Sequence, residues 1–354
     1  MGYYRRINTV DTHTAGEPTR VVTSGFPMIR VQSMVEAKLR LQEDFDHLRT
    51  ALLHEPRGHQ DMFGAIVFPP TVPKANFGVV FMDGGGYLNM CGHGSMGVVR
   101  ALAEIGMLND TQDEVLLDTP AGVIQASISD DDEGALISIK NIPSYVHGPS
   151  IRFPAERLAQ VGLETADGGP LIVDVSFGGN FFALVDSQQF DEDLQRPPLD
   201  DLVELALILR DYINVEARPQ HPESPDIGGV DLVEFYYKTG VTRDNASNRR
   251  TLTGRNLVVF GEGQIDRSPC GTGTSAEMAL LLKKGLMSVD DDLVQSGVLD
   301  TKFRGHIIAE TVVAGNPGII PEIAGRAYVT GFNQFVLDDR DPLSNGFSLR
   351  SLGG

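Results

Sequence analysis

The sequence predicts a mixed α/β protein that contains two similar domains. Short runs of β-branched residues alternate with a smaller number of stretches whose apolar residues recur every three or four positions. In addition, the pattern C-G-H-G-S at 91–95 returns as C-G-T-G-T at 270–274, each time after a strand-like run. The shared context favours duplication of one α/β unit over a chance match.

Strands are predicted where β-branched or alternating runs lie between glycines and prolines. These runs are G-V-V-F (78–81), E-V-L-L-D-T (114–119), A-L-I-S-I (135–139) and L-I-V-D-V-S-F (171–177). Helical spacing of apolar residues predicts helices at 35–41, 45–53, 97–104, 199–213 and 276–284. The polar segment 239–254 has no apolar period and is expected to be an exposed loop or the tip of a long hairpin.

Both copies of the cysteine motif precede a segment that is typical of a buried helix ending near a glycine. These segments are M-G-V-V-R-A-L-A-E-I-G-M-L and S-A-E-M-A-L-L-L-K-K-G-L-M. Each half of the chain is therefore expected to place one cysteine at a strand-to-helix turn. We assign residues 1–139 plus 330–354 to a first domain, which carries Cys91, and residues 140–329 to a second, which carries Cys270.

Composition excludes several classes of protein. A net charge of −19 opposes binding to nucleic acid or to an anionic membrane, since both require clustered Lys and Arg. No signal peptide and no apolar stretch long enough to span a bilayer is evident. Two cysteines in 354 residues exclude a disulfide framework and a multi-thiolate zinc site. We expect a cytoplasmic protein with reduced thiols.

The two cysteines have the chemistry of acid/base groups. A cysteine that opens a helix has its thiolate stabilised by the helix dipole and by free N–H groups, so the pKa of the thiol falls towards neutral pH. The glycines at 92, 94, 271 and 273 let backbone amides approach an anion such as a carboxylate. Two opposed thiols can invert a stereocentre, because one removes a proton and the other delivers one from the opposite face.

No sequence motif for a phosphate, a nicotinamide or a pyridoxal cofactor is evident, so we expect the chemistry to need no cofactor and no metal. Residues His54, Glu55, His59 and Asp61 form a cluster that resembles a set of metal ligands, but Arg57 lies within it. A structural or supporting role is the better interpretation of this cluster.

An ordered set of motifs along nearly the whole chain resembles the proline racemase family, which includes 4-hydroxyproline epimerases and trans-3-hydroxyproline dehydratases. These motifs are D-T-H-T-A-G-E-P-T-R (11–20), E-P-R-G-H (55–59), M-D-G-G-G-Y-L-N-M-C-G-H-G-S (82–95), F-G-G-N-F-F-A (177–183), D-R-S-P-C-G-T-G-T (266–274) and T-G-F-N-Q-F (330–335). The resemblance implies the diaminopimelate-epimerase-like fold: two pseudo-symmetric domains, each with strands wrapped around a central helix, and an active site in the cleft between them. It also implies a homodimer.

The same resemblance implies a role for each matching residue. Cys91 and Cys270 correspond to the two catalytic bases, and His93 and Asp266 to positions beside the substrate amine. Backbone amides hold the substrate carboxylate, and two aromatic residues enclose the ring; these residues are Gly92, His93, Gly271, Thr272, Phe63 and Phe260.

The presence of both cysteines favours a racemase or epimerase, because dehydratases of this family usually replace one of them. Hydroxyproline epimerases tend to have Trp and a further aromatic where this chain has N-F-F-A at 180–183, and this chain has no Trp. The expected reaction is therefore interconversion of L- and D-proline, and the 82–94 block looks most like bacterial proline racemases. Ser95 and the 239–254 segment depart from the family pattern.

Alternatives remain for the function and for each residue. The protein could be a 4-hydroxyproline 2-epimerase, a trans-3-hydroxyproline dehydratase or a non-catalytic amino-acid binder. Cys91 and Cys270 could be inert buried thiols, His93 a turn residue, Asp266 the cap of the turn before Pro269, and the two phenylalanines ordinary core residues.

Overall fold

The computed structural model describes residues 4–109, 114–190, 199–243 and 249–348. The chain divides into two compact units: unit one comprises 1–139 and 325–354, and unit two comprises 140–324. The boundary expected at 329/330 lies in the same strand, β20 (Asn316–Asp338), which begins in unit two and ends in unit one. Because the strand is continuous, no change in composition marks the boundary.

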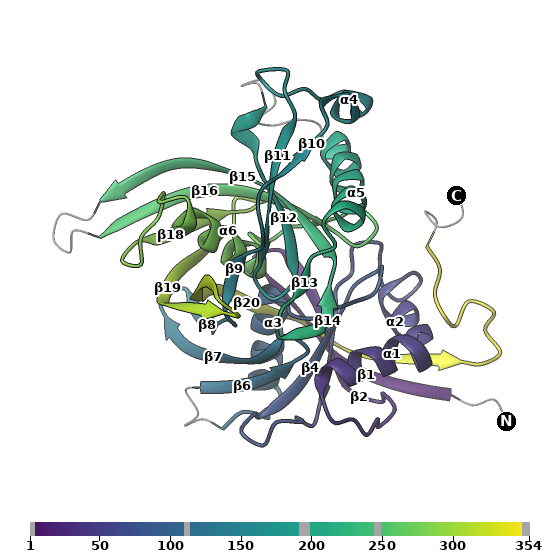
Figure 1. The fold of residues 1–354 in the computed structure, drawn as a ribbon. Coiled ribbons are helices and arrows are strands. Elements are labelled where there is room, and N and C mark those ends of the chain that lie inside the picture. The colour runs from purple at the N-terminus through teal and green to yellow at the C-terminus, as the bar shows by residue number, and fades with distance from the viewer. Residues whose placement is uncertain (1–3, 110–113, 191–198, 244–248, 349–354) are drawn as a thin grey trace. The chain divides into compact units, whose positions relative to one another are not determined.

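Unit one wraps its strands around one helix (Figure 1). Its helices are α1 (Met34–Asp44), α2 (Asp46–Leu53) and α3 (Gly92–Glu104), and its strands are β1 (Tyr4–Thr14), β2 (Glu17–Ser24), β3 (Gly64–Phe68), β4 (Phe77–Met82), β5 (Tyr87–Leu88), β6 (Glu114–Thr119), β7 (Gly122–Asp131), β8 (Gly134–Lys140) and the end of β20. Helix α3 packs against β1, β2, β3 and β7, and its first eight residues are all buried. Helices α1 and α2 cover a second apolar core that includes Leu41, Leu52, Ile66 and Val80.

Unit two repeats this plan around α6 (Gly271–Lys283). Its other helices are α4 (Ala155–Leu158) and α5 (Leu199–Glu216), and its strands are β9 (Ser144–Val146), β10 (Ile151–Phe153), β11 (Leu171–Phe177), β12 (Phe181–Asp186), β13 (Gln220–His221), β14 (Ser224–Gly228), β15 (Val230–Arg243), β16 (Arg250–Phe260), β17 (Gln264–Asp266), β18 (Asp292–Ser296) and β19 (Lys302–Val313). Helix α6 packs against β9, β11, β12 and β19 and is buried from Gly271 to Leu281.

Strand pairing follows the same order in both units. In unit one, β1–β2 is antiparallel, β2–β3 parallel, β3–β4 antiparallel, β4–β5 antiparallel and β4–β6 parallel. In unit two, β11–β12 is antiparallel, β12–β15 parallel, β15–β16 antiparallel, β16–β17 antiparallel and β16–β18 parallel. In chain order, α3 lies between β5 and β6, and α6 lies between β17 and β18. This agreement supports the duplication inferred from the repeated motif.

The mixed α/β class and the predicted strands and helices are confirmed, with two differences. Helices α3 and α6 begin at residues 92 and 271, five residues before the predicted starts at 97 and 276, because glycine-rich first turns carry no apolar period. At 239–254 the loop alternative is wrong and the hairpin alternative is confirmed: β15 and β16 continue there as an antiparallel pair, with Val241 opposite Leu252. Residues 239–243 are exposed, so neither face of this ribbon is buried and its sequence has no alternation of apolar residues. Residues 244–248 lie outside the described part of the chain.

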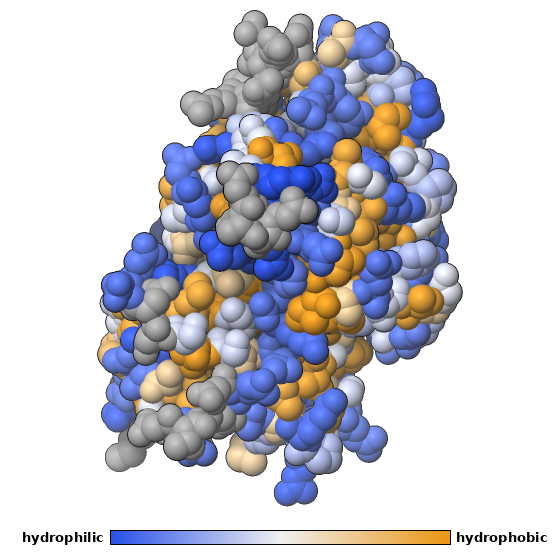
Figure 2. All heavy atoms as spheres, turned by 90° about the vertical axis from the view of Figure 1, so that its left-hand side faces the viewer, coloured by the Kyte–Doolittle hydropathy of each residue, from blue (hydrophilic) through white to orange (hydrophobic). Residues whose placement is uncertain are grey.

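The surface and the interior differ as expected for a globular protein. On the face drawn in Figure 2, hydrophilic side chains lie among smaller groups of hydrophobic ones. The largest fully buried side chains are aromatic, and they include Tyr145, Tyr236, Phe63 and Phe81. No helix among the described residues is long and apolar enough to cross a membrane.

Candidate active site

Cys91 lies at the N-cap of α3 and is nearly fully buried. Its Sγ accepts a hydrogen bond from the backbone N–H of Gly94 at 3.3 Å. The same sulfur lies 3.2 Å from Nδ1 of His93. An N–H donor and the positive end of a helix both stabilise a thiolate, so this environment favours ionisation of Cys91.

The turn that carries Cys91 is held on several sides. Ser95 donates from Oγ to the Cys91 carbonyl at 2.6 Å, and Thr14 donates from Oγ1 to the His93 carbonyl at 3.0 Å. The ring of Phe63 meets the His93 ring edge-on, with centroids 4.6 Å apart. A Cβ at Gly94 would lie 3.0 Å from Phe63, so glycine is what allows this contact. The structure thus brings Cys91, His93 and Phe63 together.

Cys270 occupies the matching place at the start of α6 but in a different conformation. Its φ of 54° lies in the left-handed region, where a residue with a Cβ is strained. Its N–H donates to Oγ of Ser268 at 3.1 Å, and its Sγ lies 3.7 Å from Oγ1 of Thr272. Unlike Cys91, its side chain accepts no capping hydrogen bond from the helix.

The residue before Cys270 is fixed from two directions. The carbonyl oxygen of Pro269 accepts from Nδ2 of Asn256 at 2.8 Å and from Oγ1 of Thr274 at 3.0 Å. These bonds hold the strained backbone in place, because the carbonyl before Cys270 cannot rotate without losing two partners. The observed strain marks this turn as a functional candidate.

Asp266 and Phe260 lie on the β16–β17 hairpin that leads to Cys270. Oδ1 of Asp266 accepts the backbone N–H of Ser268 at 2.8 Å, which is the turn-capping role weighed above. Phe260 ends β16 opposite Gln264 and is buried. Asp266 therefore contacts the turn that leads to Cys270, Gly271 and Thr272, while Phe260 lies near the tip of the β16–β17 hairpin. Roles of these residues beside a substrate remain predictions.

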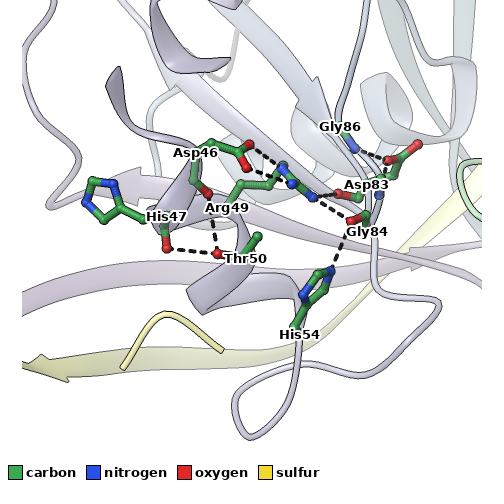
Figure 3. A network of polar contacts seen from close by, with 9 residues as sticks. Asp46, His47, Arg49, Thr50, His54, Asp83, Gly84 and Gly86 are labelled. Carbon is green, nitrogen blue, oxygen red and sulfur yellow. Dashed lines mark hydrogen bonds and ion pairs between the residues drawn. The ribbon is translucent and has the colours of Figure 1, made fainter. Parts of the chain in front are cut away.

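Sequence reasoning missed the residues that hold the 83–86 turn, which precedes β5 and Cys91 in the chain (Figure 3). Arg49 on α2 is buried and donates to both carboxylate oxygens of Asp46 and to the backbone carbonyls of Asp83 and Gly84. The Asp83 side chain accepts the N–H groups of Gly85 and Gly86, each at 2.7 Å. The D-G-G-G sequence signals a turn, but nothing in its pattern indicates the arginine that anchors it.

The His54 cluster does not form a metal site in the described residues. Nε2 of His54 lies 3.0 Å from the carbonyl oxygen of Gly84, so this ring contacts the same turn that Arg49 anchors. The structure therefore favours a supporting role for His54.

A family model described as proline racemase matches residues 9–348. The chain belongs to the proline racemase family. The proline racemase of Acetoanaerobium sticklandii is 42% identical over 352 residues, which cover 99% of this chain and all of that relative. The 4-hydroxyproline epimerase of Brucella ovis is 36% identical over 342 residues, which cover 96% of this chain and 97% of that protein.

Among solved structures, a hydroxyproline epimerase from Agrobacterium vitis with bound trans-4-hydroxy-L-proline aligns with a TM-score of 0.84 at 29% identity. The alignment covers 99% of this chain and 97% of that one. As a member of the proline racemase family with racemase and epimerase relatives along its full length, the chain is an isomerase of the racemase and epimerase class.

Proposed function

We propose that this protein interconverts L- and D-proline with Cys91 and Cys270 as its two acid/base thiols and without a cofactor. The observation that carries the proposal is that two cysteines, one in each unit, begin buried helices in equivalent positions of a repeated fold. The 42% identity to a proline racemase along the full chain supports proline as the substrate.

In the proposed reaction, the thiolate of one cysteine removes the α-proton and becomes a thiol. The other thiol gives its proton to the opposite face of the α-carbon and becomes a thiolate. The roles reverse for the other enantiomer, so one enzyme serves both directions. The first N–H groups of α3 and α6, at Gly92, His93, Gly271 and Thr272, lie at the positive ends of these helices and are suited to bind the substrate carboxylate.

Phe63, Phe260, His93 and Asp266 complete the proposed site. The two buried rings would enclose the apolar part of a pyrrolidine, and the two polar residues would face its amine. The contact of His93 with Sγ of Cys91 gives it a second role, since a donor at that distance stabilises the thiolate.

Replacing either thiol tests the mechanism. Cys91→Ser and Cys270→Ser should each lower racemisation by roughly 10²–10⁴-fold or more, because a serine hydroxyl is a far weaker acid than a thiol. Polarimetry from both enantiomers measures the rate, and deuterium uptake at the α-carbon in heavy water reports each proton transfer. Racemisation at the original rate in either folded variant would refute the two-thiol mechanism.

Epimerisation of 4-hydroxyproline is the second candidate, favoured by the structural similarity to an epimerase with bound trans-4-hydroxy-L-proline. The two candidates share their chemistry and differ in the contacts to the ring hydroxyl. Turnover of proline and of trans-4-hydroxyproline should be compared directly; a site that hydrogen-bonds the hydroxyl loses heavily on proline. Formation of pyrroline carboxylate from trans-3-hydroxyproline would instead reveal a dehydratase, and proline binding without deuterium uptake would reveal a non-catalytic binder.

A further inference from the structure

Unit two buries two carboxyl groups beside the helix that carries Cys270. Glu234 on β15 and Glu277 on α6 are both 0% exposed. Nδ2 of Asn256 donates to Oε1 of Glu234 at 2.6 Å, and Nε2 of Gln295 donates to Oε2 of Glu277 at 3.0 Å. The two carboxyl groups lie close enough for each to act on the other, and Oε2 of Glu234 and Oε1 of Glu277 have no hydrogen-bond partner among the described residues.

These two buried oxygens can partner each other only if one of the carboxyl groups is protonated. An ionised carboxylate only accepts, so two carboxyl groups form a hydrogen bond only when one of them is protonated. Burial acts in the same direction, because it disfavours the charged form. It raises the pKa of Glu234 to about 8 and that of Glu277 well above its ordinary value.

The other charged groups that face the pair do not neutralise it. Asp266 acts on Glu234 and Asp186 acts on Glu277, and each of these carboxylates raises the pKa of its neighbour. Lys238 lowers the pKa of Glu277, but this effect is smaller than that of the acidic neighbours. The pair therefore lies in a mainly negative environment.

The pair is close to Cys270 by two routes. A Cβ on Gly273 would lie 2.5 Å from Oε2 of Glu234 and 3.2 Å from Sγ of Cys270, so the carboxyl group and the sulfur approach the same point. Asn256, which donates to Glu234, donates also to the carbonyl of Pro269. A charge on the pair thus acts on the sulfur through space and on its backbone through Asn256.

We propose that Glu234 and Glu277 share one proton while Cys270 titrates, and that the single negative charge of the pair keeps Cys270 in its thiol form. The N-terminal end of α6 stabilises a thiolate at Cys270, and the negative charge of the pair acts against this effect, because a nearby negative charge disfavours a thiolate. The two glutamates are therefore positioning residues. Cys91 has the opposite setting, with an N–H donor to its sulfur. The consequence for turnover rests on the proposed function: at rest, Cys91 is the base and Cys270 the acid.

The pH dependence of thiol alkylation tests this proposal in the full-length protein. Iodoacetamide is applied across a pH series, and mass spectrometry of the separate peptides follows Cys91 and Cys270. In Glu277→Gln, the amide donates to Glu234, which keeps its charge, so the Cys270 midpoint stays in place. In the double variant Glu234→Gln with Glu277→Gln, the two side chains keep their shape but the negative charge of the pair is lost. The Cys270 midpoint should fall by about one pH unit.

Cys91 is the internal reference, because its unit contains neither glutamate, and its midpoint should not move. A Cys270 midpoint that is equal in the wild type and the folded double variant would overturn the proposal. Infrared spectroscopy provides a second measurement that needs no double variant: at about pH 9, above the pKa of Glu234, the wild type should show a protonated-carboxyl stretch that Glu277→Gln loses. Absence of this band in the wild type would equally overturn it.

These measurements use no substrate, so they separate the proposal from the proposed function. A shifted Cys270 midpoint in a protein that fails to racemise proline would support the carboxyl pair and contradict the assigned reaction. Normal racemisation of proline with an unshifted Cys270 midpoint in the double variant would support the assigned reaction and contradict the carboxyl pair.

Discussion

At the scale of single residues, two cysteines in nearly identical motifs have different surroundings. Cys91 has an extended backbone and a capped sulfur, whereas Cys270 has a left-handed φ and an uncapped one. A conformation of this kind costs on the order of 1–3 kcal/mol and persists because its neighbours enforce it. The motif C-G-x-G-[ST] indicates where both cysteines lie but not that their environments differ, because that difference comes from Ser268 and Asn256, outside the repeated letters.

Gly178 offers a test of how tightly the first turn of α6 is packed. A Cβ at this position would lie 2.2 Å from the carbonyl oxygen of Thr272 and 2.9 Å from the backbone nitrogen of Ala276. Gly178→Ala should therefore destabilise the protein by about 1–3 kcal/mol and slow racemisation, since backbone atoms must move. Urea unfolding and a proline racemisation assay measure both effects. Gly86→Ala is the control, because a Cβ there meets no atom within 4 Å; equal losses in the two variants would contradict the packing argument.

At the scale of elements, the sequence predicts strands and helices well where periodicity is strong and poorly where glycine or polar residues interrupt it. The strand at 171–177 coincides with its predicted range, while the first turns of α3 and α6 were missed. For 239–254 the sequence left a loop and a hairpin both open for a related reason: hydrogen bonds between β15 and β16 stabilise an exposed pair that has no apolar alternation. The supporting residues of the site were also not predictable, because the contact of Arg49 with the 83–84 carbonyls joins segments far apart in sequence.

The anchoring of the 83–86 turn by α2 leads to a prediction for Arg49. Arg49→Met removes the hydrogen bonds to Asp46 and leaves the carbonyls of Asp83 and Gly84 without this donor, at a cost of about 2–3 kcal/mol. Thermal unfolding should show the loss, and kcat should fall because the turn leads through β5 to Cys91. Arg40→Met is the matched control: its pair with Asp44 is exposed and screened by solvent, so its loss should change stability little. If both variants lose the same stability, the turn does not depend on this arginine.

At the scale of the whole molecule, the repeated order of strand pairing accounts for the two matched cysteine turns. Duplication was predictable because the repeated motif lies between similar flanking segments. The buried carboxyl pair was not, because Glu277 occurs in an apolar helix sequence and its partner lies on a distant strand. Only the fold brings them together.

This pair predicts how stability changes with pH. The pKa of Glu234 rises from an ordinary value of 4.5 to about 8 through burial, so the folded state keeps a proton that the unfolded chain releases. The stability that this retained proton contributes is fully present below about pH 4.5 and decreases as pH rises towards 8. The free energy of unfolding changes by about 1.4 kcal/mol per pH unit for each retained proton. Urea midpoints measured across this range should decline less steeply when Glu234 and Glu277 are both replaced by Gln.

Asp291 acts in the opposite direction but outside that window. Arg250 holds the pKa of Asp291 at about 2, so its contribution is lost only as pH falls through that value. Above pH 4.5 the histidines His147 and His221, whose pKa values burial lowers from 6.5, add stability as pH rises, so the comparison with the double variant is what isolates the carboxyl pair. Parallel curves for the wild type and the double variant would contradict the assignment.

The continuous strand β20 has a consequence for how the protein is made. Strand β1 leaves the ribosome well before its partner, the end of β20, which is synthesised after all of unit two. During that interval one edge of β1 lacks its native neighbour and is open to pairing with other chains. Unit two, whose residues form one uninterrupted segment, leaves the ribosome before the last strand of unit one, so the nascent protein can complete its second unit before its first.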